Sequence, residues 1–413
     1  MSISKKINLS GDKSISHRAL MIASISNGAT QISNLCNGKD VQSTIDCLQA
    51  CGADITKDRD SYIVSSSSLF NPSKPLDCGN SGTTMRLMAG LLAGQGIVAT
   101  LYGDSSLMKR PMNRIIEPLK KLGSNIDYID NQIILKKSSI NGGCVLNSTP
   151  SAQVKSSIIL AALGAKGSTF LTESYNSRDH TERMLSFYSP NCIKATNKDL
   201  TVNSYPIEIK SIEIPGDTSK ASFLIAYACM TPKSDVIIQN TLINPTRTGF
   251  INTLKRMGAN ISINNKKMKY GELVGDIHVQ YKSRLKNVYV NAQNVRDMVD
   301  EIPILAIVAA LSKGVMKIEG VSELKLKESN RVLAIISNLK KMSCDIREKE
   351  DSIMIKGRNY LYNTNINTFS DHRIAMAFHV ASFFAKHTMV LDDLECIKVS
   401  FPDFFEKLEE IKV

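Results

Sequence analysis

The sequence contains no tryptophan, and aromatic residues make up only 6% of the chain. Proteins that bind single-stranded nucleic acid commonly stack the bases on aromatic side chains. The net charge of +12 does favour acidic partners, but the lysines are dispersed along the chain. The composition therefore indicates small anionic ligands, and we expect no nucleic-acid partner. The same charge leaves one other class open, a non-catalytic anion-binding or RNA-associated protein.

Long apolar runs are absent as well. No stretch of about 18 residues runs without polar interruption, as a membrane-spanning helix would require. The ten residues before Gly11 show no signal-peptide pattern. We therefore expect a chain that begins at Met1, stays in the cytoplasm as a monomer and has no membrane partner.

The nine cysteines are scattered and never occur as CxxC. That spacing excludes the common zinc patterns. Most of them lie in apolar runs, as Cys229 does, which is typical of reduced core thiols. The sequence thus predicts neither a disulfide framework nor a metal site.

An amphipathic helix pattern recurs along the chain. It has the form Ile-x-x-Leu-x-x-apolar-small and is followed by a short tag that ends in isoleucine. The spacing of three places the apolar residues on one helix face, and a closing glycine predicts a left-handed C-cap. Clear copies begin at Ile45, Ile116, Ile251 and Ile336, and weaker copies comprise Met184 with Phe187 and Phe405 with Leu408 and Ile411.

A second class of helix alternates with the first. These helices are apolar nearly all round, which is typical of buried helices, and each precedes a short predicted strand such as residues 387–391. They are expected at residues 19–25, 85–92, 154–163, 221–230, 302–311 and 374–384.

Together the two classes define a unit that occurs six times. Units start near residues 14, 83, 153, 219, 300 and 371, so three fall in each half of the chain. The unit is longer than a usual solenoid repeat, which favours two closed α/β domains. We expect one domain at 12–216, another at 1–11 plus 217–413, and hinges near Gly11 and Gly216.

The stretch Gly11–Leu20, GDKSISHRAL, leads into the first buried helix. Ser14 and Ser16 are residue types that favour an N-cap, and Lys13 and Arg18 add charge at the same end. A helix start has free N–H groups and a positive dipole end, so it suits an anion. Alone, the stretch is more typical of a solvated cap with two surface cations, but GDTS recurs at 216–219, which favours the anion site.

The other helix starts are polar too. Each alone fits an ordinary cap or a solvated surface. Together they predict an anion-attracting site in the cleft between the domains. The polar stretches are 77–86, 103–112, 151–153, 300–301, 325–331 and 371–373.

These stretches carry a resemblance to a known family. GDKSISHRAL, GNSGTTMR, GDSSLMKRPM, SAQVKS, SRDHTERML, DEIP, KLKESNR, DHRIAMA and SFPDFF occur in the order found in EPSP synthases, with features of the class II branch. The resemblance implies a two-domain inside-out α/β barrel of the EPT/RTPC-like type, with three helix-strand units per domain.

The resemblance also implies an activity: transfer of the enolpyruvyl group of phosphoenolpyruvate to the 5-hydroxyl of shikimate 3-phosphate, with no metal or cofactor. The residues it assigns to shikimate 3-phosphate are Lys13, Ser14, Arg18, Ser151, Gln153, Arg178, Asp300 and Lys327. Those assigned to phosphoenolpyruvate are Lys13, Asn80, Gly82, Arg86, Arg110, Gln153, Arg331 and Arg373.

Three residues are candidates for proton transfer. Asp300, a carboxylate among cations, should have a lowered pKa and suits the base that accepts the hydroxyl proton. Glu328 is the candidate acid toward C3 of phosphoenolpyruvate, and Lys13 is able to share that role.

A few positions depart from the commonest family pattern. Asp12 and His17 stand where Ser and Asn are usual, and Ala152 removes a hydroxyl that Arg178 is expected to replace. Gly82 keeps the glycine that leaves room for glyphosate, so we expect glyphosate to inhibit the enzyme.

The nearest alternative function is that of the enolpyruvyl transferase for UDP-N-acetylglucosamine. That family carries a cysteine in the loop that corresponds to residues 105–110, and this chain has none there.

Overall fold

The computed structural model describes residues 4–65, 68–147, 151–174, 177–196, 199–362 and 364–413. The chain divides into two compact units. We call Gly11–Ile214 with Met268–Glu272 the N-terminal unit, and Met1–Ser10, Pro215–Lys267 and Leu273–Val413 the C-terminal unit. The chain thus passes between units at 10–11 and 214–215, beside Gly11 and Gly216, and again around the hairpin tip 268–272.

Three helices form the interior of the N-terminal unit: α1 (Lys13–Ala23), α3 (Gly82–Gly94) and α5 (Ala152–Ala162). Helix α3 packs against both others. It approaches α5 so closely that a Cβ at Gly90 would lie 2.1 Å from the carbonyl oxygen of Ser157. Only glycine permits this backbone approach.

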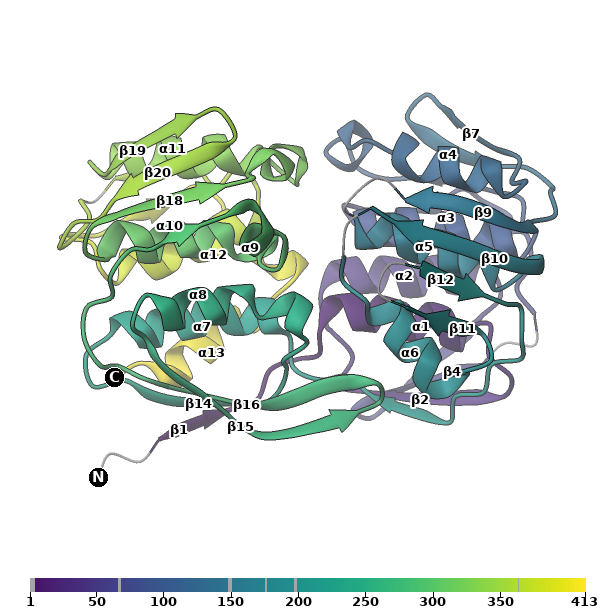
Figure 1. Ribbon diagram of the computed structural model, residues 1–413, viewed down its shortest axis with the longest axis horizontal. Coiled ribbons are helices and arrows are strands. Elements are labelled where there is room, and N and C mark those ends of the chain that lie inside the picture. Colours follow the sequence, from purple (N-terminus) through teal and green to yellow (C-terminus); the bar gives the residue numbers. More distant parts are fainter. Residues whose placement is uncertain (1–3, 66–67, 148–150, 175–176, 197–198, 363) are drawn as a thin grey trace. The chain divides into compact units, whose positions relative to one another are not determined.

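Three four-stranded sheets and three amphipathic helices complete this unit (Figure 1). The sheet orders are β13-β2-β4-β3, β5-β6-β8-β7 and β11-β12-β10-β9. The strands are β2 (Ala29–Ser33), β3 (Asp54–Asp58), β4 (Ser61–Ser65), β5 (Leu76–Asp77), β6 (Ala99–Tyr102), β7 (Ile126–Ile129), β8 (Gln132–Leu135), β9 (Asn141–Asn147), β10 (Lys166–Glu173), β11 (Ile193–Ala195), β12 (Asp199–Val202) and β13 (Ser211–Glu213). The helices are α2 (Lys39–Ala50), α4 (Asn113–Lys121) and α6 (His180–Tyr188).

The C-terminal unit repeats the plan around α7 (Thr218–Met230), α10 (Ile302–Leu311) and α12 (His372–Ser382), which pack on one another. Its sheets have the orders β1-β14-β16-β15, β17-β18-β20-β19 and β21-β22. The strands are β1 (Lys5–Ile7), β14 (Asp235–Leu242), β15 (Asn260–Lys269), β16 (Glu272–Gln280), β17 (Tyr289–Val290), β18 (Val315–Glu319), β19 (Asp345–Lys349), β20 (Ser352–Lys356), β21 (Asn365–Ile366) and β22 (Val390–Leu391). The remaining α-helices are α8 (Gly249–Arg256), α9 (Ala292–Arg296), α11 (Arg331–Lys341) and α13 (Phe404–Ile411).

The predicted α/β fold class with three helix-strand units in each half is thereby confirmed. In four of the six units the buried helix joins two parallel neighbouring strands, as α3 joins β5 and β6. In the other two units, the strand that precedes the buried helix pairs with a strand of the other half of the chain. Strand β1 pairs with β14 of the C-terminal unit, and β13 pairs with β2 of the N-terminal unit.

The predicted C-caps are confirmed. Gly52, Gly123 and Gly258 follow their helices with φ of 94°, 94° and 98°. In the fourth copy Ser343 takes the same left-handed conformation, with φ of 60°.

The predicted N-cap of the first helix is wrong. Asp12, not Ser14 or Ser16, caps α1, and its Oδ1 accepts a hydrogen bond from the Ile15 amide at 2.9 Å. The Ser16 hydroxyl instead donates to the Asp12 carbonyl. Asp217 caps α7 in the same way, so the aspartate of each GDxS turn is the capping residue.

Two predicted apolar faces are also wrong in detail. Phe187 and Phe405 are 55% and 38% exposed. Helix α13 buries Phe404, Leu408 and Ile411 instead, because that set fits one helix face. The predicted strand at 387–391 shortens to β22, since its partner β21 offers only two residues for pairing.

All nine cysteines are free thiols, and eight of them are buried as predicted. Cys144 in β9 is exposed. No helix in the described part of the chain has the length and apolar character needed to cross a membrane.

Replacing Ser343 by glycine should raise the free energy of unfolding by about 0.5 kcal/mol, because glycine adopts the left-handed conformation without steric cost. Urea unfolding of Ser343→Gly measures this change. The matched control Ser337→Gly lies inside α11 and should lower the free energy of unfolding by about 0.5 kcal/mol. A destabilised Ser343→Gly variant would contradict the conformational argument.

Candidate active site

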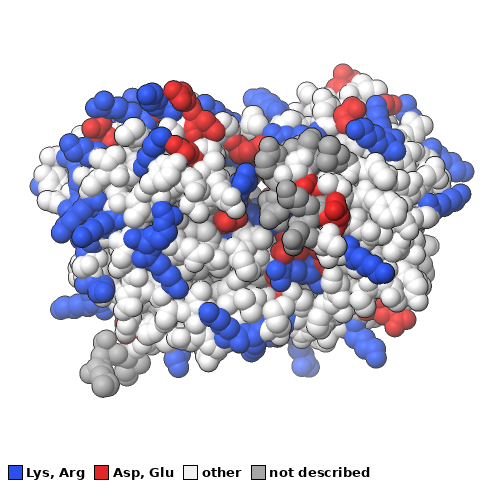
Figure 2. Space-filling view, in the orientation of Figure 1, with Lys and Arg blue, Asp and Glu red and all other residues white. Residues whose placement is uncertain are grey.

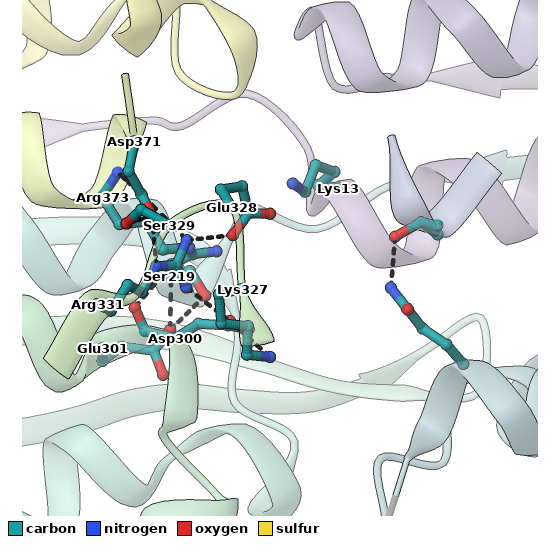
Figure 3. A network of polar contacts seen from close by, with 12 residues as sticks. Lys13, Ser219, Asp300, Glu301, Lys327, Glu328, Ser329, Arg331, Asp371 and Arg373 are labelled. Atoms are coloured by element: carbon teal, nitrogen blue, oxygen red, sulfur yellow. Dashed lines mark hydrogen bonds and ion pairs between the residues drawn. The ribbon is translucent and has the colours of Figure 1, made fainter. Parts of the chain in front are cut away.

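A buried arginine organises the polar residues of the C-terminal unit. Arg331, the first residue of α11, is 1% exposed. Its Nε lies 2.8 Å from Asp371 Oδ2, and its Nη2 lies 2.6 Å from Glu328 Oε2. Its Nη1 lies 3.6 Å from Asp300 Oδ1. We call Asp300, Lys327, Glu328, Arg331, Asp371 and Arg373 the Arg331 cluster (Figure 3).

Helix starts position these side chains. Asn330 caps α11 through the amide of Leu333, and Asp371 caps α12 through the amide of Arg373. Asp371 Oδ1 accepts that amide at 2.9 Å, while the same carboxylate pairs with Arg331. One aspartate thus fixes both a helix start and a guanidinium.

The charges of the pair reinforce each other. Burial by itself raises the pKa of Asp371, but the positive charges of Arg331 and His372 and the hydrogen bond from Arg331 together outweigh it and lower that pKa below its usual value. Burial by itself lowers the pKa of Arg331, but Asp371 and Glu328 outweigh it and raise that pKa. Both groups are therefore ionised near neutral pH.

Asp300 lies in the 3₁₀ turn Val299–Glu301, directly before α10. Its Oδ1 is 3.8 Å from the Lys327 ammonium as well as 3.6 Å from Arg331. Its backbone carbonyl accepts a hydrogen bond of 3.1 Å from Arg373 Nη1. The carboxylate of Asp300, the predicted base, thus faces the cations of Lys327 and Arg331, and its backbone is hydrogen-bonded to Arg373.

Sequence reasoning placed Glu301 and Asp371 in polar helix starts but gave neither a role in the site, and it missed Arg247. Glu301 is 1% exposed, accepts a hydrogen bond from the Ser219 hydroxyl and lies 3.9 Å from Arg373 Nη1. Arg247, also buried, donates to Ser219 Oγ at 3.0 Å. The position of Asp371 at the cap of a buried helix was a usable signal in the sequence, whereas Arg247 has no such signal.

The N-terminal unit gathers a second set of predicted residues around Gly82 at the start of α3. Arg86 Nη1 donates to Gln153 Oε1 at 2.5 Å, and Arg110 Nη2 donates to Asn80 Oδ1 at 2.8 Å. A Cβ at Gly82 would lie 3.0 Å from Arg86 Nη1 and 3.2 Å from Arg110 Nη1. We call Asn80, Gly82, Arg86, Arg110 and Gln153 the Gly82 cluster.

The amides of Asn80 and Gln153 orient the two arginines of the Gly82 cluster. Asn80 Nδ2 donates to Asp104 Oδ2 at 2.6 Å, and Gln153 Nε2 donates to Thr83 Oγ1 at 2.9 Å. Each amide oxygen then faces a guanidinium. Two guanidiniums at a capped helix start form an arrangement suited to a carboxylate or phosphate group.

Lys13 begins α1 and pairs with Asp40 of α2 at 2.7 Å. Four residues on, burial lowers the pKa of His17 to about 3. This histidine is therefore neutral at physiological pH, and the cations of the helix start are Lys13 and Arg18.

Arg18 holds three helices together. Its Nε donates to Thr181 of α6 at 2.8 Å, and its Nη2 donates to Ser156 of α5 at 2.6 Å. Its Nη1 donates to the carbonyl of Ser14. Ser151 directly precedes α5, and Arg178 lies two residues before α6. The structure therefore gives Arg18 a packing role, and its role toward substrate stays a prediction.

The predicted binding sets thus divide between the units. The C-terminal unit brings together Asp300, Lys327, Glu328, Arg331 and Arg373. The N-terminal unit holds Lys13, Ser14, Arg18, Asn80, Gly82, Arg86, Arg110, Ser151, Gln153 and Arg178.

The site chemistry is that of cations, amides and carboxylates. Within the ranges that the structure describes, no three His, Cys, Asp or Glu side chains are grouped to hold a metal ion. Lys and Arg outside the site are spread over the face seen in Figure 2 rather than gathered in one patch. The arrangement suits small anions and proton transfer.

Comparison with known proteins identifies relatives over the whole length. The family model for EPSP synthase (3-phosphoshikimate 1-carboxyvinyltransferase) matches residues 1–408. A 3-phosphoshikimate 1-carboxyvinyltransferase from Bacillus pumilus (strain SAFR-032) is 39% identical over 414 residues, which cover 98% of this chain and 96% of the relative.

Solved structures agree with this similarity. EPSP synthase from Acinetobacter baumannii matches with a TM-score of 0.87 and 33% identity, covering 99% of this chain and 96% of that one. The enolpyruvyl transferase NikO from Streptomyces tendae matches with a TM-score of 0.79 at 14% identity, covering 100% and 95% of the two chains. The second similarity concerns the fold alone.

Replacing Asp371 by asparagine should lower the free energy of unfolding at pH 7 by about 3 kcal/mol, because it leaves the buried Arg331 without its main counter-charge. The folded-state pKa of Asp371 is lowered, so its stabilisation is present above the unfolded pKa of about 3.9 and is lost as pH falls through the folded pKa. The difference from wild type should therefore shrink below about pH 4.

Urea unfolding at pH 7 and at successively lower pH measures this difference. The control Asp345→Asn removes an exposed partner of Arg347 and should change stability by at most about 0.5 kcal/mol. Equal effects of the two substitutions would contradict the importance assigned to the buried pair.

Proposed function

This chain belongs to the EPSP synthase family, and from that membership we propose how its two clusters divide one reaction. Enzymes of this family are 3-phosphoshikimate 1-carboxyvinyltransferases. The chain transfers the enolpyruvyl group of phosphoenolpyruvate to the 5-hydroxyl of shikimate 3-phosphate and releases phosphate. This reaction belongs to the shikimate pathway, which supplies aromatic amino acid biosynthesis.

The Gly82 cluster is suited to phosphoenolpyruvate. Two arginines held by Asn80 and Gln153 offer bidentate donors to a carboxylate or a phosphate. The missing side chain at Gly82 keeps the space between them open. In this proposal Arg331 and Arg373 of the C-terminal unit bind the same substrate, and Lys13 contacts both substrates.

Shikimate 3-phosphate is assigned to polar groups from several helix starts. They comprise Lys13, Ser14, Arg18, Ser151, Gln153 and Arg178 in the N-terminal unit and Asp300 and Lys327 in the C-terminal unit. Convergence of the two clusters on one pair of substrates in an interdomain cleft stays a prediction, as do the cytoplasmic location and the monomeric state.

The observation that carries the mechanism is the position of Asp300. A carboxylate 3.6 Å from Arg331 and 3.8 Å from Lys327 is stabilised in its ionised form. It is therefore available to accept the proton of the 5-hydroxyl as that oxygen attacks C2 of phosphoenolpyruvate. Attack at C2 together with a proton added to C3 gives a tetrahedral intermediate. This intermediate then loses phosphate from C2 and a proton from C3, which restores the enol double bond.

The acid toward C3 is assigned to Glu328, with Lys13 able to share the role. Glu328 pairs with Arg331 at 2.6 Å, and it is the ionised carboxylate that forms such a pair. Glu328 must therefore take up a proton before it can donate one. The proton accepted by Asp300 is one source, and the Lys13 ammonium is an alternative donor.

The predicted alternative activity on UDP-N-acetylglucosamine is not supported. The family model and the relative at 39% identity both carry the 3-phosphoshikimate 1-carboxyvinyltransferase description. The non-catalytic alternative leaves the Asp300 and Glu328 carboxylates within the Arg331 cluster unexplained.

A phosphate-release assay with shikimate 3-phosphate and phosphoenolpyruvate tests the function and the base. Wild type should release phosphate from the pair of substrates, and Asp300→Ala should lower kcat at least about 100-fold, since general bases contribute that much. Asp345→Ala, at an exposed ion pair, is the matched control and should keep full activity. Absence of release by wild type would refute the function, whereas full activity of Asp300→Ala would refute only the assignment of the base.

Substitution of Gly82 by alanine tests the phosphoenolpyruvate assignment. The added methyl group would lie 3.0–3.2 Å from both guanidiniums, so we expect a KM for phosphoenolpyruvate about tenfold higher, equivalent to ~1.4 kcal/mol. We also expect glyphosate to inhibit the wild type and to inhibit Gly82→Ala less. Gly143 in β9 has open space for a Cβ, and Gly143→Ala serves as control. An unchanged KM would place phosphoenolpyruvate elsewhere.

A further inference from the structure

Lys155 is a charged residue on a helix that is otherwise apolar on nearly all sides. Its side chain is 2% exposed, yet neither the proposed binding sets nor the catalytic residues include it. Burying an ammonium is costly unless it is paired. Its Nζ lies 2.7 Å from Glu173 Oε2 and 2.6 Å from Glu182 Oε1.

The two carboxylates come from opposite sides of one short segment. Glu173 is the last residue of β10, and Glu182 lies in the first turn of α6. Between them stands Arg178, which is assigned to shikimate 3-phosphate. The Lys155 ammonium therefore forms ion pairs on both sides of Arg178 in the sequence, with Glu173 before it and with Glu182 after it.

A further contact reaches the residue next to Arg178. The Ser177 hydroxyl donates to Glu173 Oε1 at 2.8 Å, so Glu173 bridges Ser177 and Lys155. On the other flank Thr181 shares a hydrogen bond of 2.7 Å with Ser156, the residue after Lys155. Arg178 is thus framed by side chains that are anchored on α5.

The protonation state fits an anchoring role. Burial by itself lowers the pKa of Lys155, but Glu182 and Glu173 outweigh it and raise that pKa. The ammonium is therefore charged throughout the physiological range. Apolar residues often replace buried ion pairs without loss of stability, so stability alone gives little reason for a lysine at this position.

We propose that Lys155 is a positioning residue for shikimate 3-phosphate, acting through Glu173, Glu182 and Ser177 to hold Arg178 in place for the substrate phosphate. The inference rests on the proposed function and on the assignment of Arg178 to that substrate. It predicts an effect confined to shikimate 3-phosphate, because Arg178 is not among the residues assigned to phosphoenolpyruvate. The two binding sets share only Lys13 and Gln153.

The test compares steady-state kinetics of Lys155→Met, Ser177→Ala and Arg178→Ala with the control Ser168→Ala, an exposed hydroxyl on the same strand β10. Lys155→Met and Ser177→Ala should each raise the KM for shikimate 3-phosphate about tenfold, since a small misplacement of a binding group is sufficient for such a loss. The KM for phosphoenolpyruvate and kcat should stay within about twofold of wild type.

A double-mutant cycle identifies the route of the effect. In an Arg178→Ala background, Lys155→Met and Ser177→Ala should no longer raise the KM for shikimate 3-phosphate, because the group that they position is absent. A residue with only a structural role would give additive losses or would raise both KM values together. Either result would overturn the proposal.

Two further outcomes separate this inference from the function on which it rests. If Lys155→Met does not fold, Ser177→Ala decides alone, and its unchanged KM overturns the proposal. If Arg178→Ala itself leaves the KM for shikimate 3-phosphate unchanged, the assignment of Arg178 falls and the inference with it, while wild-type phosphate release still supports the transferase activity.

Discussion

A helix that is buried on every side has room for polar groups only at its ends or where partners within the fold satisfy them, and this constraint shapes both units. Six such helices form the two interiors. Their backbone N–H groups at the first turn need partners, and capping side chains such as Asp12, Ser81, Asp217 and Asp371 supply some of them. The same ends carry most of the proposed binding groups, so the packing of the core and the proposed location of the chemistry have one cause.

The Arg331–Asp371 pair shows the energetic side of this arrangement. A guanidinium that is almost fully buried is stable only with a well-formed counter-charge, and Asp371 provides it while also capping α12. Glu328 and Asp300 then face the remaining guanidinium nitrogens. The carboxylates proposed for proton transfer are thereby held by a group that is itself fixed by the fold, which is the preorganisation that the proposed mechanism requires.

The repeat and the helix classes were predictable because hydrophobic spacing is a local property of the chain. Gly52, Gly123 and Gly258 likewise predicted the C-terminal ends of their helices. The contacts of Glu301 and Arg247 were not predictable, since they depend on residues more than 25 positions away. Nor was the capping role of Asp12 over Ser14, which is decided by where the first turn begins. Phe187 and Phe405 show that a spacing of three alone does not decide which side of a short helix is buried.

The exchange of β1 and β13 has a consequence for the order of folding. Strand β1 leaves the ribosome before its partner β14, which follows more than 220 residues later, at Asp235–Leu242. The N-terminal unit, by contrast, has its exchanged strand β13 near its own end and is able to complete its sheets during synthesis. Until β14 arrives, β1 is an unpaired edge of the kind that promotes misassociation. Its sequence, Lys5-Lys6-Ile7, places two positive charges on that edge, which discourages pairing between copies of the nascent chain.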